Sequence, residues 1–439
     1  MASRDYFKGK RIAVIGLGPH GEMVTDIKFL IKAGALVAVY DLRSEARLKS
    51  HLVFLRSIGL ANYVCGSIPA DDLLDMDLII LSHEYPRNSS FLKEAEDKKI
   101  SIEYQETLFF RLAPPLTVIG VMGAVGKATV VSMLEPLLES ACDALEGQGF
   151  CVIDPESDGG ILSNLKKVKT GDILLARIVE SIMKELYEMR ISPHVAIFTT
   201  IPPKGSYFSN PFEILTYQTY NNFIVASDDV IDATHRLKFQ PKAKMLRTKA
   251  SLLGLDWLPN ARAAHDRDNA SLALQVARLF KVPDEVAQPI LDTWKALKGR
   301  LEFVKKIKNV EFYNDTASVS VSSTESAIKN ISQGRNIILI FGGAEGGSEY
   351  APLYTVLPKY VHTVILLPGS GTIRQRQALQ KIDHIKVVSA QSVEDAVVLA
   401  MEHAHQNDRV LFSPGFEASG MENSRKERGE SFVKAVRGL

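Results

Sequence analysis

A glycine-rich stretch carries the clearest chemical pattern in this sequence. In "IGVMGAVGKATV", Gly123, Gly126 and Lys127 have the G-x-x-G-K spacing of a phosphate-binding loop and follow an apolar run. Backbone N–H groups and the lysine of such a loop hold phosphates. The next position usually provides a hydroxyl for magnesium, but here it is Ala128, with Thr129 after it as a partial substitute. The stretch predicts either an ATP site or a structural glycine turn with a solvated lysine.

A second glycine loop lies near the beginning of the chain. Gly16, Gly18 and Gly21 follow an apolar strand in "KRIAVIGLGPHG", and the next strand, "LVAVYDLR", contains Asp41 and Arg43. This is the layout of a dinucleotide-type site, in which a loop and a helix N-terminus receive phosphate and an acid receives the ribose or base. A tight strand-to-helix turn needs the same glycines without any ligand, so ligand binding and a purely structural turn are both open.

These loops must be positioned by α/β units, and a third unit of the same plan begins at "NIILIFGGAEGG" (336–347). Glycines at the carboxyl end of a strand let a ligand approach the backbone. Two prolines in "LAPPL" (112–116) resist helix and central strand, and Gly299 in "KALKGRLEF" precedes a new strand. We therefore predict three α/β domains, with bounds 1–114, 115–298 and 299–439.

Composition narrows the class of protein. The 439 residues are 46% hydrophobic and 23% charged, with a net charge of +1, so the chain as a whole has no electrostatic signature of nucleic-acid or membrane binding. The three cysteines are scattered, and the histidines show no zinc-ligand spacing. A polar start and no apolar run of membrane-spanning length lead us to expect a soluble, cytoplasmic protein, without signal peptide. We expect a monomer.

Several segments resemble the Mur ligases, the ATP-dependent amide-forming enzymes of peptidoglycan precursor synthesis. The resemblance spans nearly the whole chain and includes "IGLGPHG", "VYDLR", "LFFRLAPPLTVIGVMGAVGKATV", "AHDRDNASLAL", "LKGRLEFVKKIKNVEFYNDTAS" and "VLFSPGFEASGMENSRKERGESF". It implies an N-terminal Rossmann-like UDP-binding domain, a central P-loop ATPase-like domain with a parallel sheet, and a C-terminal Rossmann-like α/β domain.

The resemblance also implies substrates and a reaction. ATP and a UDP-linked carboxylate would form an acyl phosphate, which the amine of an amino acid attacks. The closest pattern is the branch that adds D-glutamate to UDP-N-acetylmuramoyl-L-alanine. The UDP-binding positions implied are Gly18, Asp41 and Arg43. The ATP-binding positions implied are Gly123, Gly126, Lys127, Thr129, His265, Asn269, Arg300 and Asp315.

Some of these residues have ordinary structural interpretations. Asp315, after a strand, is suited to a ribose hydroxyl or to capping the next helix. Arg300 is suited to a γ-phosphate or to tying two domains together. Asn269 is suited to adenine or to a helix cap. A structural hydrogen bond is an equal alternative for His265.

The sequence departs from the family where the resemblance implies metal and amino-acid ligands. Family members use Mg²⁺, held by a loop hydroxyl, a Glu, a Asp-His turn and a carbamylated lysine. Here these positions hold Ala128, Arg177 and Lys204, with no lysine in "FEILTYQTYNNF". Three further family positions, two lysines and a serine, hold Ala317, Gly346 and Ala418. We therefore predict no protein ligands for a metal.

Arg177 and Lys204 replace acidic or metal-binding groups with cations, so this region favours an anion. We predict Lys127, Arg177 and Lys204 as the catalytic cations, with structural salt bridges as the alternative. The leading prediction of function is a ligase that adds D-glutamate to UDP-N-acetylmuramoyl-L-alanine. Two alternatives remain: a non-catalytic homologue that binds a UDP-sugar or nucleotide as a regulator or scaffold, and a ligase with a different substrate.

Overall fold

The computed structural model describes residues 2–18, 21–144, 149–154, 160–201, 210–249, 264–318, 321–344, 350–416 and 425–439. Three separate sheets organise these residues, and each consists of consecutive strands of the chain. The chain divides into two compact units, the first comprising 1–256 and 268–291 and the second 257–267 and 292–439. Within the described ranges no helix is both long and apolar enough to cross a membrane.

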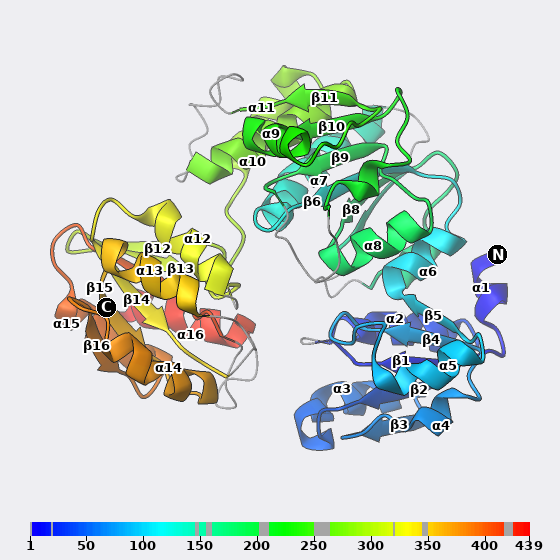
Figure 1. Ribbon diagram of the computed structural model, residues 1–439, viewed down its shortest axis with the longest axis horizontal. Helices are drawn as coiled ribbons and strands as arrows, with labels where there is room; N and C mark the ends of the chain where they lie inside the picture. Colours follow the sequence, from blue (N-terminus) through cyan, green and yellow to red (C-terminus); the bar gives the residue numbers. More distant parts are fainter. Residues whose placement is uncertain are drawn as a thin grey trace. The chain divides into compact units, whose positions relative to one another are not determined.

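The first sheet is parallel, with strand order β3-β2-β1-β4-β5 (Figure 1). Its strands are β1 (Arg11–Ile15), β2 (Leu36–Asp41), β3 (Asn62–Cys65), β4 (Leu78–Leu81) and β5 (Ser101–Tyr104). Its helices are α1 (Ala2–Phe7), α2 (Met23–Lys32), α3 (Glu45–Ser57), α4 (Ala70–Leu73), η1 (Ser90–Leu92), α5 (Lys93–Asp97) and α6 (Gln105–Leu112). The strand order reverses at β1: β2 and β3 lie on one side of it, and β4 and β5 lie on the other. This places the first glycine loop at the switch point where α/β proteins bind ligands.

The second sheet is also parallel, in the order β11-β10-β9-β6-β8-β7. Its strands are β6 (Thr117–Met122), β7 (Phe150–Ile153), β8 (Ile173–Arg177), β9 (Val195–Phe198), β10 (Phe223–Ala226) and β11 (Lys244–Arg247). Its helices are α7 (Lys127–Ala144), η2 (Leu162–Lys166), α8 (Glu180–Glu188), η3 (Glu213–Leu215), α9 (Asp228–Arg236), α10 (Ala264–Leu279) and α11 (Asp284–Thr293). Since β6 lies between β8 and β9, the second glycine loop also occupies a switch point.

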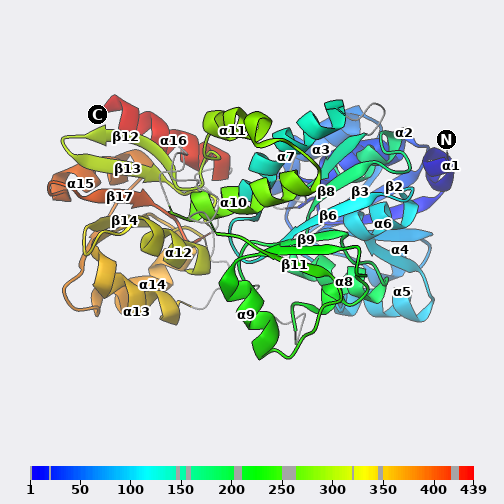
Figure 2. The ribbon, with the colours of Figure 1, turned by 90° about the horizontal axis from the view of Figure 1, so that it is seen from above.

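The third sheet is mixed, in the order β12-β13-β17-β14-β15-β16, and only its β12–β13 pair is antiparallel. Its strands are β12 (Glu302–Ile307), β13 (Val310–Asn314), β14 (Ile337–Phe341), β15 (Val361–Leu366), β16 (Lys386–Ser389) and β17 (Arg409–Phe412). Its helices are α12 (Val321–Ile331), α13 (Ala351–Tyr360), α14 (Ser370–Gln380), α15 (Val393–His403) and α16 (Arg425–Gly438). Figure 2 shows α16 beside β12 and β13.

Apolar strands explain why these sheets form. All five residues of β8 and all five of β14 are buried, as expected for parallel strands covered on both faces. One continuous core runs through the first two sheets, which explains why they belong to a single compact unit. Two further clusters pack around the third sheet. The α/β class with three parallel-type sheets is confirmed, whereas the residue bounds given for three domains stay predictions.

Candidate functional site

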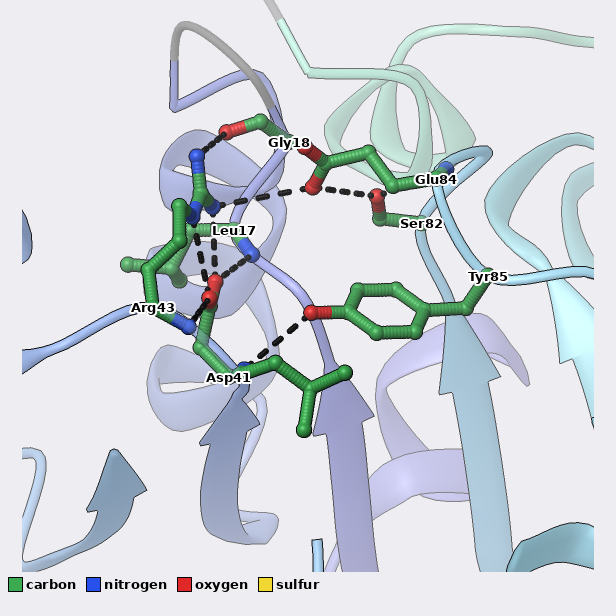
Figure 3. Close-up of polar contacts among 8 residues, drawn as sticks. Leu17, Gly18, Asp41, Arg43, Ser82, Glu84 and Tyr85 are labelled. Atoms are coloured by element: carbon green, nitrogen blue, oxygen red, sulfur yellow. Dashed lines mark hydrogen bonds and ion pairs between the residues drawn. The ribbon is translucent and has the colours of Figure 1, made fainter. Parts of the chain in front are cut away.

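The first glycine loop is held by a bidentate ion pair at the end of β2 (Figure 3). Arg43 donates from Nε to Asp41 Oδ1 at 2.9 Å and from Nη2 to Asp41 Oδ2 at 2.6 Å. The same carboxylate accepts from the Leu17 backbone N–H at 3.0 Å, and Arg43 Nη1 donates to the Gly18 carbonyl at 3.0 Å. The structure therefore brings all three predicted UDP-binding residues together.

Asp41 lies in the interior of the protein. Its side chain is fully buried, and burial by itself would raise the pKa of the carboxyl. The hydrogen bonds from Arg43 and Leu17 outweigh burial, so the pKa of Asp41 lies below its ordinary value. Asp41 thus positions the loop and Arg43, and Arg43, with a quarter of its side chain exposed, is the group of the pair that can reach a ligand.

The carboxyl end of β4 adds acidic and aromatic groups that the sequence analysis missed. Glu84 lies 3.6 Å from Arg43 Nη2 and accepts from Ser82 Oγ at 3.3 Å. Burial raises the pKa of Glu84, and the charge of Arg43 opposes that rise. The Tyr85 hydroxyl accepts from the Leu42 backbone N–H at 3.2 Å (Figure 3). Polar residues directly after the apolar strand β4 could have indicated this site in the sequence, because β4 lies next to β1 in the sheet.

Two glycines of the second loop are required by close neighbours. Gly123 has a φ of +127°, and a Cβ there would lie 2.3 Å from Thr199 Oγ1. Gly126 has a φ of +93°, and a Cβ there would lie 2.7 Å from Asn269 Oδ1. The loop is therefore packed between the segment after β9 and helix α10. Asn269 is buried and is the sixth residue of α10, so its alternative role as a cap of that helix is wrong.

Two backbone N–H groups of this loop already have a partner. Thr200 Oγ1 accepts from the N–H of Ala124 at 2.9 Å and from that of Val125 at 3.3 Å. Thr199 Oγ1 donates to the Val125 carbonyl. The Thr200 hydroxyl thus occupies the donors that a phosphate oxygen would use. Both threonines were missed in the sequence because they reach the loop only through the pairing of β9 with β6.

Lys127 begins α7 and folds back over the loop. Its ammonium donates to the carbonyls of Gly123 and, at 3.4 Å, Ala124. Glu180, at the beginning of α8, interacts electrostatically with Lys127: burial raises the pKa of Glu180 and the lysine lowers it. Glu180 was also missed, although it lies just after β8, next to β6 in the sheet. Thr129 is in the first turn of α7, where its carbonyl accepts from Ser132.

Arg177, the last residue of β8, is only 4% exposed and forms an ion pair with Asp154 at 3.0 Å. This contact favours the structural alternative for Arg177 over a role as a catalytic cation. Lys204, Gly346 and Ala418 lie outside the described residues, and so does the side chain of His265, although its backbone is part of α10. Their predicted roles are unchanged.

A magnesium ion prefers several oxygen ligands in octahedral geometry. In the described ranges near the loop, the carboxylate of Asp154 is paired with Arg177 and that of Glu180 interacts with Lys127. The position after the lysine is Ala128. These described residues do not fit a magnesium site.

Arg300 and Asp315 belong to the second unit. Asp315 is buried, which raises the pKa of its carboxyl to about 6 despite hydrogen bonds from Ser318 and Ser413 and the charge of Arg300. The carboxylate accepts from the Leu301 N–H at 3.1 Å and from Ser413 Oγ at 2.8 Å. Asp315 therefore ties the beginning of β12 to the residue after β17, and Arg300 lies within its electrostatic reach.

The fold is of the α/β class, with three sheets and a glycine loop after β1, β6 and β14. The loop after β6 has the spacing of a phosphate-binding loop. Comparison with known proteins relates this fold to a particular enzyme family. Residues 299–416 match the family model described as "Mur ligase, glutamate ligase domain". This stretch is therefore similar to the glutamate ligase domain of the Mur ligases.

Similarity to known proteins extends over nearly the whole chain. A curated relative from Clostridioides difficile (strain 630), UDP-N-acetylmuramoylalanine–D-glutamate ligase, is 27% identical and covers 98% of this chain and 99% of its own length. UDP-N-acetylmuramate-alanine ligase MurC of Thermotoga maritima has the same fold, with a TM-score of 0.58 at 14% identity over 98% of this chain and 99% of its own. MurF ligase of Thermotoga maritima, solved with ADP, gives a TM-score of 0.54 at 16% identity over 98% and 96%.

Proposed function

We propose that the chain is an ATP-dependent ligase of the MurD type, which joins D-glutamate to UDP-N-acetylmuramoyl-L-alanine. The observation that carries this proposal is the match to a protein named for that activity, over 98% of this chain. The glycine loop with Lys127 at the switch point of the second sheet supports ATP as the other substrate. The family resemblance also leads us to expect a monomer in the cytoplasm.

The proposed reaction has two steps. A carboxylate oxygen of the UDP-linked acid attacks the γ-phosphorus of ATP, and ADP leaves, which gives an acyl phosphate. The amine of the amino acid then attacks the acyl carbon, inorganic phosphate leaves with the electrons of the broken C–O bond, and the amine releases a proton to solvent. One phosphorylation thus activates the carboxylate, and the attack of the amine yields an amide.

Each loop of the first unit has a role in this proposal. We assign the phosphates of ATP to Lys127 and to the N–H groups of Ala124 and Val125, which exchange the Thr200 hydroxyl for phosphate oxygens. We assign the UDP part to the first loop and Arg43. Contacts of His265, Asn269, Arg300 and Asp315 with ATP stay predictions, and so does the catalytic role of Lys204.

The test is a product assay. The purified chain is incubated with ATP, UDP-N-acetylmuramoyl-L-alanine and D-glutamate, and ADP and the UDP-linked dipeptide are measured by mass spectrometry. We expect both products, and no dipeptide when D-glutamate is omitted or replaced by L-glutamate. A panel of other amino acids separates a changed substrate from a lost activity. If no amino acid in the panel gives ADP and a UDP-linked product, the ligase proposal is overturned.

The charge of the triphosphate has to be balanced without the metal ligands that the family resemblance implies. We propose that protein cations, led by Lys127, take over this role. Free ATP should then bind at least as tightly as its magnesium complex. Titration calorimetry with ATP in EDTA and in excess magnesium tests this, and tenfold tighter binding of the complex, ~1.4 kcal/mol, would show that metal ligands exist.

A non-catalytic nucleotide-binding homologue is the second candidate. Two contacts favour it: Arg177 is engaged by Asp154, and Thr200 occupies the donors of the loop. This candidate predicts that UDP or ATP raises the melting temperature of the protein while the product assay gives neither ADP nor dipeptide. A regulator or scaffold has no need of the cations that a phosphoryl transfer requires.

A further inference from the structure

Three potential metal ligands meet at the amino end of the third sheet. His362 is the second residue of β15, Asp408 directly precedes β17, and His405 lies between α15 and β17. Both strands flank β14, so their first residues are brought to the same edge. The ligand atoms of the three side chains lie within 4.8 Å of one another. No spacing in the sequence could reveal this, because the first histidine is distant from the other two residues along the chain.

The distances fit a coordination sphere. His362 Nε2 lies 3.0 Å from Asp408 Oδ2, and His405 Nδ1 lies 3.4 Å from the same oxygen. Ligand atoms around a tetrahedral zinc ion, with bonds of about 2.0–2.1 Å, are separated by roughly 3.3 Å. His405 is 80% exposed, so its ring is free to turn towards an ion.

The surrounding contacts orient two of the three ligands. The other ring nitrogen of His362, Nδ1, lies 2.9 Å from Thr363 Oγ1, the kind of outer contact that fixes a metal-binding imidazole. Asp408 is buried, and its carboxylate accepts from the His405 backbone N–H at 2.6 Å. One buried carboxylate and one oriented imidazole are thus in position before an ion arrives.

We propose that His362, His405 and Asp408 bind a transition-metal ion of the zinc class, with water completing the coordination. Imidazole nitrogen favours Zn²⁺, Co²⁺, Ni²⁺ and Cu²⁺ over Mg²⁺ and Ca²⁺. Arg335, which donates to the Val361 carbonyl at 3.2 Å, adds positive charge near His362, so binding depends on the imidazole ligands rather than on charge alone. The ion would join the beginning of β15 to the segment before β17 and stabilise the second unit. This site is independent of the ligase reaction.

The test uses the full chain without a histidine tag, in excess Mg²⁺, so that oxygen-rich sites are already occupied. Equilibrium dialysis with Zn²⁺ should give one bound ion per chain, and Co²⁺ should produce a visible absorption band of imidazole coordination. His405→Gln and Asp408→Asn should each weaken Zn²⁺ binding at least about tenfold. Both keep a group that can make hydrogen bonds at the same position, and folding is checked by circular dichroism.

The matched control is His235→Gln, which removes an exposed histidine from the last turn of α9. It should bind Zn²⁺ as the parent does. Equal Zn²⁺ affinity in the parent, His405→Gln and Asp408→Asn would overturn the proposal and leave the three side chains as a hydrogen-bonded cluster. An absence of Zn²⁺ binding in the folded parent would do the same.

Discussion

Lys127 is the residue on which the ATP assignment depends most. In the structure its ammonium satisfies loop carbonyls, and with ATP it would turn to the phosphates. Lys127→Met should weaken ATP binding by at least ~1 kcal/mol, about fivefold, the scale of a lost charge-assisted hydrogen bond. Calorimetry measures this, with Lys184→Met, an exposed lysine of α8, as the control. Equal affinities of parent and Lys127→Met would make the loop a structural turn.

Thr200 should have the opposite effect. Its hydroxyl accepts from two loop N–H groups that a phosphate would need, so ATP has to displace it. Thr200→Val keeps the shape of the side chain and removes this competitor. We expect ATP to bind to the variant several-fold more tightly, by about 1 kcal/mol.

The same titration distinguishes the alternative role of this residue. If the Thr200 hydroxyl instead holds the loop in the shape that binds phosphate, the valine variant will bind ATP more weakly than the parent. Thr216→Val, a hydroxyl at the end of η3 that donates to the Glu213 carbonyl, is the control for a general effect of the substitution.

Among the elements, α2 and η2 are joined by a buried carboxyl. Asp26 of α2 accepts from the N–H groups of Ile161 at 2.9 Å and Ser163 at 3.3 Å. Burial raises the pKa of Asp26 to about 7, which these hydrogen bonds oppose and the charge of Glu106 reinforces. His83 lies 2.8 Å from that Glu106 carboxylate. Asp26 therefore titrates near neutral pH.

This raised pKa predicts how stability depends on pH. Between the unfolded pKa near 4 and the folded pKa near 7, the folded protein holds a proton that the unfolded chain has lost. The free energy of unfolding should then fall as pH rises through this range, by up to about 1.4 kcal/mol per pH unit from this group. Denaturant titrations at pH 5 and 8 should show the parent losing stability relative to Asp26→Asn. The variant Asp232→Asn, at an exposed position, should show the same change of stability with pH as the parent. If the pKa of Asp26 were ordinary, Asp26→Asn would show that same change too.

Elements also mark how far the sequence could predict the site. The strand before each glycine loop was predictable because apolar runs and glycines are local signals; β1 (Arg11–Ile15) lies in the apolar run before the first loop, as expected. Glu180 and Thr200 were missed because they reach the loop through pairing with β8 and β9. The partner of Arg177 was equally hidden, since Asp154 comes from the end of another strand. The part of the site that the sequence did not predict is therefore formed by contacts between strands that are distant in sequence.

At the scale of the whole molecule, the clusters of buried side chains among the described residues follow the two compact units. One of these clusters passes through both the first and second sheets, and two others pack on the third. Residues that share a continuous core unfold together, so the three α/β regions should give two thermal transitions.

Ligands should identify these transitions, because each stabilises only the unit that binds it. UDP, assigned to the first loop, should raise one melting temperature by on the order of 5 °C at a hundredfold excess over its Kd. Zn²⁺, assigned to His362, His405 and Asp408, should raise the other and leave the first unchanged. Differential scanning calorimetry of the full chain measures both. Three transitions would show that the first two sheets unfold separately despite their common core, and a single transition moved by either ligand would show that the whole chain is one cooperative unit.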